Sequence, residues 1–258
     1  MFNLKNKVAV VTGGAGYIGF SISEALAEAG AEVFITGRNQ DKVKSVAREL
    51  EKTSGGKVKG VTMNIESYDS IKNCLNQIES ESGKIDVLVN NASSLPVGKL
   101  QDISETDWKM GMDGTINGVF RCTKLVTPIM EKAGGGSIVN ISSIYGSISP
   151  DPSIYQNTGY DSPPHYGAGK AAIQQFTRYT ACHLAQKGIR VNSVSPGAFP
   201  KPEIQKNEEF INNLKKKIPL NRIGQPNELK GVIVFLASQA SSYVTGENIH
   251  VDGGWTAW

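Results

Sequence analysis

The stretch Val8-Ala-Val-Val-Thr-Gly-Gly-Ala-Gly-Tyr-Ile-Gly19 decides the fold of this chain. It begins with a continuous apolar run, which is typical of a strand buried on both faces of a parallel sheet. Gly14, Gly16 and Gly19 then fit the pattern G-x-G-x-x-G between that strand and a helix. Glycines here allow a tight turn and bring backbone close to a pyrophosphate, and the helix N-terminus supplies free N–H groups and a positive dipole. The stretch therefore predicts dinucleotide binding, with a glycine-rich turn that holds no ligand as the alternative.

Short β-branched runs alternate with amphipathic stretches of helical length along the whole chain. The expected strands are 7–12, 32–36, 57–63, 85–89, 137–142, 190–195 and 248–251, and the expected helices are 18–29, 41–52, 67–81, 105–132, 166–186 and 226–238. This alternation predicts an α/β fold, with one doubly wound sheet of about seven mostly parallel strands and helices on both faces. We expect a single domain over residues 1–258, with ligands at the carboxyl ends of the strands.

Composition excludes several other classes of protein. Of the 258 residues, 39% are hydrophobic and 20% are charged, as in an ordinary globular domain. The net charge of +3 is too small to indicate nucleic-acid or membrane binding, and no apolar run approaches the roughly 20 residues that span a bilayer. Cys74, Cys122 and Cys182 are widely scattered, which favours reduced thiols in a cytoplasmic protein and predicts no metal site.

Tyr166 and Lys170 form a candidate proton-transfer pair in the segment Tyr-Gly-Ala-Gly-Lys. Residues four apart share one face of a helix. A nearby ammonium favours the phenolate and is expected to lower the pKa of Tyr166 from about 10 toward the range of efficient acid–base catalysis. The spacing alone is a weak indication, because it occurs by chance in many helices.

Arg38 bears on the choice of cofactor. About 20 residues after the glycine turn, NAD enzymes usually carry an acidic residue that binds the ribose. This chain has Gly37-Arg38 at that place. An arginine can pair with a 2′-phosphate, so NADP(H) is favoured over NAD(H), which stays open.

Seven motifs in order resemble the short-chain dehydrogenase/reductase family over nearly the full chain. They are TGGAGYIG (12–19), NNAS (90–93), NISS (140–143), YGAGK (166–170), NSVSPG (192–197), PLNRIGQPNEL (219–229) and YVTGENIHVDGG (243–254). The resemblance implies a nicotinamide-dependent alcohol dehydrogenase or carbonyl reductase of single-domain Rossmann type. It also implies a homotetramer or homodimer built on the helices 105–132 and 166–186.

The same resemblance assigns roles to individual residues. Tyr166 matches the catalytic acid/base, Lys170 the residue that lowers its pKa and binds the nicotinamide ribose, and Ser143 the hydroxyl that holds the substrate oxygen. The residues expected to bind the cofactor, besides Tyr166 and Lys170, are Gly13, Gly14, Gly16, Tyr17, Ile18, Gly19, Arg38, Asn64, Ile65, Asn91, Ala92, Pro196, Gly197 and Phe199.

Four positions depart from the family pattern. Thr115 stands where an asparagine usually holds a water that links the lysine to solvent, which leaves the proton relay open. Asn64 replaces an aspartate near the adenine, and Tyr17 replaces a glycine of the dinucleotide turn. Lys201 replaces a threonine; its ammonium could meet a phosphate of substrate or cofactor, or be an ordinary solvated lysine.

The largest departure is the separation of Ser143 and Tyr166 by 23 positions, more than is usual in the family. We expect substrate loops at 145–165 and 198–217. Ser93, Tyr145, Tyr155, Tyr160, His165 and Lys201 are the candidate substrate residues. Prolines stiffen the first loop, and its tyrosines offer stacking faces and hydrogen bonds that suit hydroxyl-rich substrates. It looks like loops of bacterial flagellin-glycan and surface-sugar dehydrogenases; a loop that only caps the fold or contacts another subunit is the alternative.

Three functions remain in competition. The first is an NAD(P)-dependent oxidoreductase that interconverts alcohol and carbonyl on a small, polar, sugar-derived substrate. The second is a 3-oxoacyl thioester (acyl-carrier-protein) reductase, against which the polar loop and Lys201 argue mildly. The third, of another class, is a dinucleotide-binding regulator with little turnover, which the change at Thr115 keeps open.

Overall fold

One parallel sheet organises the chain, in a computed structural model that describes residues 1–94 and 96–258. Its seven strands lie in the order β3-β2-β1-β4-β5-β6-β7. They are β1 (Val8–Thr12), β2 (Glu32–Gly37), β3 (Lys57–Thr62), β4 (Val87–Asn90), β5 (Gly136–Ile141), β6 (Ile189–Pro196) and β7 (Asn248–Val251). The strand order reverses between β1 and β4, and this switch point is where a doubly wound sheet opens a crevice for ligands.

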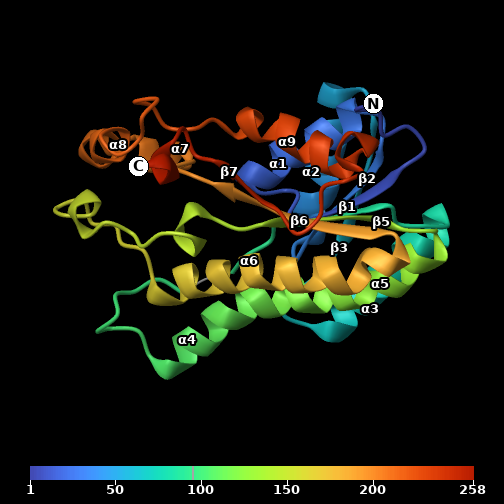
Figure 1. Cartoon of the computed structure of the whole chain (residues 1–258), viewed down its shortest axis with the longest axis horizontal. Helices are drawn as coiled ribbons and strands as arrows, with labels where there is room; N and C mark the ends of the chain where they lie inside the picture. The colour runs from blue at the N-terminus through green and yellow to red at the C-terminus, as the bar shows by residue number, and fades with distance from the viewer. Residues whose placement is uncertain (95) are drawn as a thin grey trace.

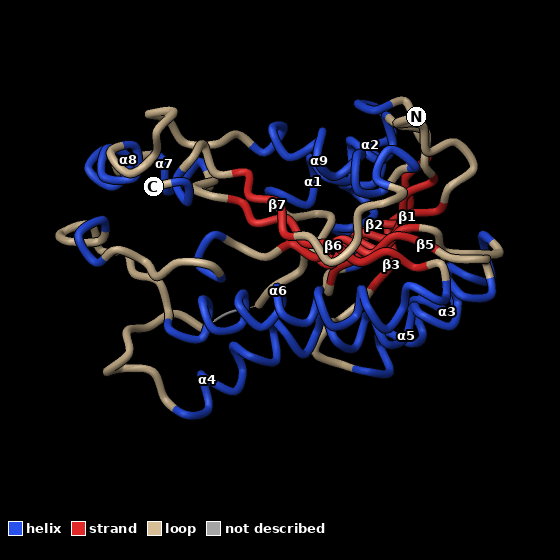
Figure 2. The backbone as a smooth tube through the Cα atoms, in the orientation of Figure 1, coloured by secondary structure: helices blue, strands red, loops and turns tan. Residues whose placement is uncertain are grey.

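Helices cover both faces of the sheet, as Figures 1 and 2 show. One layer holds α1 (Tyr17–Glu28), α2 (Gln40–Ser54) and α9 (Lys230–Ala237); the other holds α3 (Tyr68–Ser82), α5 (Gly118–Lys132) and α6 (Pro164–Leu184), with α4 (Glu105–Met112) leading into it. Two short helices, α7 (Pro202–Gln205) and α8 (Glu208–Lys215), lie beside the carboxyl end of β6. Among the helices of the described residues, none is both long and apolar enough to cross a membrane.

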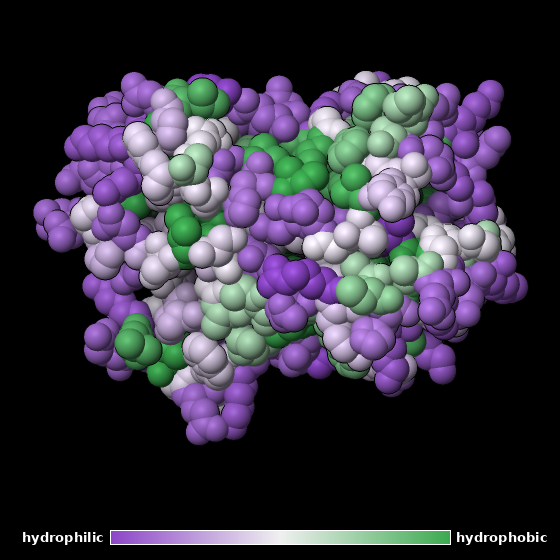
Figure 3. Space-filling model, viewed as in Figure 1, coloured by the Kyte–Doolittle hydropathy of each residue, from purple (hydrophilic) through white to green (hydrophobic). Residues whose placement is uncertain are grey.

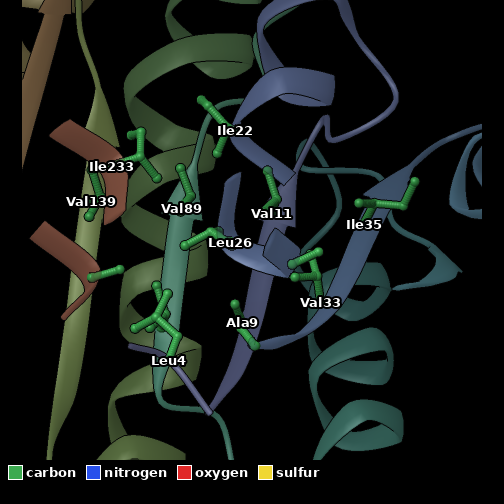
Figure 4. Packing of buried hydrophobic residues seen from close by; sticks show 14 of the residues in the cluster. Leu4, Ala9, Val11, Ile22, Leu26, Val33, Ile35, Val89, Val139 and Ile233 are labelled. Carbon is green, nitrogen blue, oxygen red and sulfur yellow. The ribbon is translucent and has the colours of Figure 1, made fainter. Parts of the chain in front are cut away.

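Each face of the sheet has its own apolar core, because strands covered on both faces must be apolar on both. Val11, Val33 and Val89 of the sheet meet Ile22 and Leu26 of α1 in one core (Figure 4). A second cluster lies between the sheet and the layer of α3, α5 and α6. The sheet is therefore a rigid platform, and its carboxyl edge can hold a site in fixed geometry.

The fold class expected from the sequence is confirmed, and the ends of the strands shift by no more than about two residues. The helix expected over 105–132 is wrong in one respect. A π-helical turn at Asp113–Asn117 separates α4 from α5. Such turns interrupt the regular hydrogen-bond ladder and change the direction in which side chains point.

The loop expected over 198–217 is also wrong in part, because α7 and α8 lie in it. The Asn207 side chain caps α8 by accepting from the Phe210 N–H at 3.0 Å, and Glu208 and Glu209 occupy the first turn, where negative charge is favoured. Buried Ile211 and Leu214 fix the helix to the rest of the molecule.

A third apolar cluster joins α8 to the segment 144–163. Ile154, Phe210 and Trp255 belong to it. The Phe210 ring lies 5.7 Å from the Tyr155 ring and 4.9 Å from the Tyr160 ring, measured between centroids. The long segment between Ser143 and Tyr166 is thus packed onto α8 at the carboxyl end of the sheet.

Candidate active site

A cavity of about 660 Å³ opens at the switch point of the sheet, within the size range of ligand sites. It follows the turn after β1, and Gly13 there has φ +64°, which favours glycine. A Cβ at Gly14 would lie 2.7 Å from Ile35, so the turn is pressed against β2. Among the described residues no side chain caps the start of α1, and its first N–H groups remain available to an anion. This bare cradle fits a dinucleotide pyrophosphate.

Asn91 braces the turn from the neighbouring strand. Its side chain donates to the carbonyl oxygens of Thr12 and Gly13 at 2.9 and 3.1 Å. The backbone N–H groups of Asn91 and Ala92 both donate to the Thr12 hydroxyl, at 2.9 and 3.0 Å. Four hydrogen bonds therefore join the end of β1 to the residues that follow β4 at the switch point.

The other residues expected to bind the cofactor are grouped around this cavity. The expected residues that line it are Gly13, Gly16, Tyr17, Ile18, Gly19, Arg38, Asn64, Ile65, Asn91, Ala92, Tyr166, Lys170, Pro196, Gly197 and Phe199. Gly14 lies beneath the turn, against Ile35 and Ser23. The structure adds Lys42, which lies in the first turn of α2 and lines the same cavity as Arg38. The sequence signal that could have found it is a second cation soon after Arg38, at the start of the helix expected over 41–52.

Ser143, Tyr166 and Lys170 converge on the other end of the cavity. Ser143 is the second residue after β5, and Tyr166 and Lys170 lie on the first turns of α6. The Lys170 Nζ donates to the Ile141 carbonyl at 2.8 Å and lies 5.8 Å from the centroid of the Tyr166 ring. The three side chains that the sequence predicts to work together do lie together.

Burial shifts the pKa values of Lys170 and Tyr166. Burial lowers the pKa of Lys170 to about 8, since removal from water disfavours the ammonium. Burial also raises the pKa of Tyr166, and the hydrogen bond with Ser143 opposes that rise. The lowered tyrosine pKa expected from the sequence is therefore not what this structure gives, because desolvation of the phenolate outweighs the groups that favour it.

Thr115 lies in the π-helical turn and is 1% exposed. Its hydroxyl donates to the Gly111 carbonyl at 2.7 Å, within its own helical segment. A Cβ at Gly169, the residue before Lys170, would run into the Thr115 hydroxyl. Thr115 thus packs against α6 at the residue before Lys170, and its hydroxyl hydrogen is donated to a backbone carbonyl.

The candidate substrate residues separate into two groups. Ser93 and Lys201 line the cavity. Tyr145 lies beside it: its ring meets those of Tyr166 and Trp255 edge-on, at 6.4 and 6.3 Å between centroids, and its hydroxyl lies 2.6 Å from that of Tyr155. Burial raises the pKa of Tyr145 above its usual range.

Tyr155, Tyr160 and His165 lie outside the set of described residues that line the cavity. The two tyrosines face Phe210 instead. His165, expected from the sequence as a substrate residue, is not brought into the cavity, because its side chain on α6 is 0% exposed and packs against α4. Its ring lies 6.4 Å from the Trp108 ring, and a Cβ at Gly111 would overlap it. Burial lowers the pKa of His165, which keeps the ring neutral.

Comparisons with known proteins agree with this geometry. The family model described as Enoyl-(Acyl carrier protein) reductase matches residues 13–256. The 3-oxoacyl-[acyl-carrier-protein] reductase FabG of Thermotoga maritima is 38% identical over 252 residues, covering 97% of this chain and 98% of that protein. A short-chain type dehydrogenase/reductase of Mycobacterium marinum has a TM-score of 0.89 and 34% identity over 100% of this chain and 98% of its own. A gluconate 5-dehydrogenase of Burkholderia cenocepacia, solved with NADP and tartrate, has a TM-score of 0.90 and 30% identity over 100% and 98%. The chain belongs to the short-chain dehydrogenase/reductase family, and it is an oxidoreductase of hydroxyl and carbonyl groups.

Proposed function

We propose that this protein is an NADP(H)-dependent carbonyl reductase that also runs in reverse as an alcohol dehydrogenase. The observation that carries the proposal is the convergence of Ser143, Tyr166 and Lys170 on the same cavity as the bare dinucleotide turn. When bound, the nicotinamide supplies or accepts a hydride. The chain itself has to orient the carbonyl and move one proton.

The proton step follows from the protonation of Tyr166. A raised pKa keeps this phenol protonated at neutral pH, so it can donate to the oxygen of a carbonyl that is being reduced. Ser143 accepts the Tyr145 backbone N–H at its Oγ at 3.1 Å, and its own hydrogen, which bonds Tyr166 in the absence of substrate, can turn to the same substrate oxygen. Lys170 holds a positive charge beside the phenol and favours the phenolate formed after proton transfer.

The adenosine end of the cavity supports NADP(H). Arg38 and Lys42 both line it, and together they present two cations where a 2′-phosphate would lie. The gluconate 5-dehydrogenase neighbour was solved with NADP. NAD(H) is the alternative that the cofactor experiment below tests.

We propose a 3-oxoacyl thioester as the leading substrate class, because the Thermotoga maritima relative carries that activity in its name. This reverses the order expected from the sequence, which placed a sugar-derived substrate first. The polar substrate stays the second candidate for two reasons. Ser93, Ser94 and Lys201 line the same cavity as Tyr166, and the tartrate-bound neighbour is a dehydrogenase of a hydroxy acid.

The test is consumption of NADPH with acetoacetyl thioesters and with a panel of keto-sugars and keto-acids. Tyr166→Phe should lower kcat by about 10²- to 10⁴-fold with little change in NADPH affinity. Tyr243→Phe is the control, because Tyr243 is a 103% exposed tyrosine that lies between α9 and β7, outside the described residues that line the cavity. Retained turnover in Tyr166→Phe would contradict the mechanism. Tight NADPH binding by the wild-type protein without turnover on any carbonyl would instead support a regulator.

A further inference from the structure

Gln174 is a buried amide at the centre of the catalytic segments. It lies one helical turn after Lys170 on α6 and is 7% exposed. Its Nε2 lies 3.2 Å from the Ser143 carbonyl oxygen, 3.0 Å from the Ser147 hydroxyl and 3.2 Å from the Ser195 hydroxyl. Its Oε1 accepts from the Ser147 hydroxyl at 3.2 Å.

The partners determine which way the amide faces. The Ser143 carbonyl can only accept, so the amide nitrogen must point toward it. The Ser195 hydroxyl gives its own hydrogen to Asn248 at 2.8 Å, and so it also accepts from Gln174. A reversed amide would place two oxygens against each other in a buried site, which is costly.

This bond completes a ladder between the end of β5 and α6. Lys170 Nζ donates to the Ile141 carbonyl at 2.8 Å. Next along the chain, the Ser142 hydroxyl donates to the Lys170 carbonyl at 2.9 Å. Gln174 then holds the carbonyl of Ser143 itself. Three successive residues, ending at the serine, are each tied to the helix that carries Tyr166 and Lys170.

The same amide reaches two further segments. Ser195 stands directly before Pro196-Gly197, which line the cavity. Ser147 lies at the base of the long segment that follows Ser143, and its hydroxyl also lies 3.0 Å from the His250 ring on β7. A Cβ at Gly146 would lie 2.7 Å from the Gln174 Nε2 and 2.8 Å from the Lys170 carbonyl, so this turn is pressed onto α6.

We propose that Gln174 is a positioning residue for the proton-transfer centre. By holding the Ser143 carbonyl it fixes the direction of the Ser143 side chain relative to Tyr166. Proton transfer needs hydrogen-bond distances at the reacting oxygen, and small misplacements cost large factors in rate. The inference rests on the proposed reductase function and concerns how its serine is oriented.

Two variants test the proposal. Gln174→Met keeps an unbranched side chain but removes both N–H donors of the amide, and it should lower kcat by about 10- to 100-fold. The KM for NADPH should stay within about twofold of the wild-type value, because Gln174 lies outside the set of described residues that line the cavity. Gln175→Met is the matched control. Gln175 is the next residue and is exposed, and its Oε1 accepts a hydrogen bond from Arg178. It should leave kcat unchanged.

Gln174→Glu tests the pH dependence of kcat, which would not change if Gln174 served only to pack the fold. A protonated carboxyl can donate to the Ser143 carbonyl and an ionised one cannot. The ratio of variant to wild-type kcat should therefore fall as pH rises, whereas the ratio for Gln174→Met should stay constant. Lys170, which itself titrates, and Arg178 lie one helical turn before and after position 174, and His250 reaches it through Ser147, so the wild-type profile must be the divisor at each pH.

The outcomes separate the two proposals. If the wild-type protein turns over but Gln174→Met equals Gln175→Met in kcat, the positioning role is overturned and the reductase function stands. A flat ratio for Gln174→Glu overturns it as well, and this variant carries the test alone if Gln174→Met does not fold. Absence of wild-type turnover with every carbonyl overturns the reductase function and the positioning role together.

Discussion

Arg38 is the side chain on which cofactor choice should depend. It is exposed at the end of β2 and lines the adenosine end of the cavity with Lys42. Arg38→Asp replaces a donor to a 2′-phosphate by a repelling charge. The ratio of kcat/KM for NADPH to that for NADH should fall by at least about tenfold, because a hydrogen bond to a charged group contributes roughly 1.5–3 kcal/mol.

Arg48→Asp makes the same change of charge on the exposed side of α2, away from the described residues of the cavity. It is the control for a general effect of charge, and it should leave the NADPH to NADH ratio as in the wild-type protein. An equal drop in both variants would mean that Arg38 does not bind the 2′-phosphate.

In the protein without bound cofactor, Lys170 should make the free energy of unfolding rise with pH above neutrality. Its pKa of about 8 in the folded state is below the 10.5 of an unfolded chain, so between these values the unfolded state binds more protons. Stability must then rise with pH in that window, and the cost of the buried ammonium is fully present below it. Between pH 7 and 9 the gain should be about 1 kcal/mol, because one pKa unit corresponds to about 1.4 kcal/mol.

The measurement is urea unfolding of the wild-type protein and Lys170→Met across this pH range. Subtracting the two series removes the contributions of Cys74 and Cys122, whose raised pKa of about 12 acts in the opposite direction above pH 9. A difference in unfolding free energy that does not change with pH would show that Lys170 has an ordinary pKa in the folded protein.

The segment 144–163 and α8 should behave as one element. Three polar contacts join them: Asn207 Nδ2 to the Thr158 carbonyl at 3.2 Å, Asn213 Nδ2 to the Ile154 carbonyl at 3.3 Å, and Lys217 to Asp151 at 2.7 Å. Phe210 packs on both Tyr155 and Tyr160. Phe210→Ala should therefore loosen the segment, expose it to limited proteolysis, and raise the KM for the carbonyl substrate by about tenfold while the KM for NADPH stays the same.

Tyr68→Ala is a suitable control, since Tyr68 is an aromatic residue 42% exposed at the start of α3. If Phe210→Ala changed the two KM values equally, the segment would serve the whole fold and not the substrate. Either result decides between a substrate loop and a cap, the two readings that the sequence leaves open.

The element scale also shows what can be predicted from sequence. The strands and the glycine turn were predictable because apolar runs and G-x-G-x-x-G are local patterns. Helix α8 could have been found from Asn207, Glu208 and the apolar Ile211 and Leu214, which match a capped amphipathic helix. The burial of His165 against Gly111, and of Tyr155 against Phe210, could not, because these contacts join segments far apart in the chain.

On the scale of the whole molecule, the face drawn in Figure 3 is mostly polar with a few separate hydrophobic patches. The helices α5 and α6 run side by side on one outer face (Figure 1), and both carry partly exposed aromatic rings. Phe120 is 46% and Tyr179 57% exposed, and the Phe120 ring meets that of Phe176 at 6.2 Å across the two helices. Exposed aromatic groups on a flat helical face are typical of a protein–protein interface.

We therefore expect this α5–α6 face to pair with a second copy of the chain, in a homodimer or a homotetramer. Phe120→Glu would place an unpaired charge at the centre of such an interface, where burial of a charge costs several kcal/mol, and should shift the mass measured by light scattering toward the monomer. Tyr243→Glu is the control, because Tyr243 is 103% exposed and lies outside α5 and α6, between α9 and β7. Since α6 also carries Tyr166 and Lys170, dissociation should lower kcat along with mass. A wild-type protein that is already monomeric at micromolar concentration would refute the pairing, and an active monomeric Phe120→Glu would show that the site is complete within one chain.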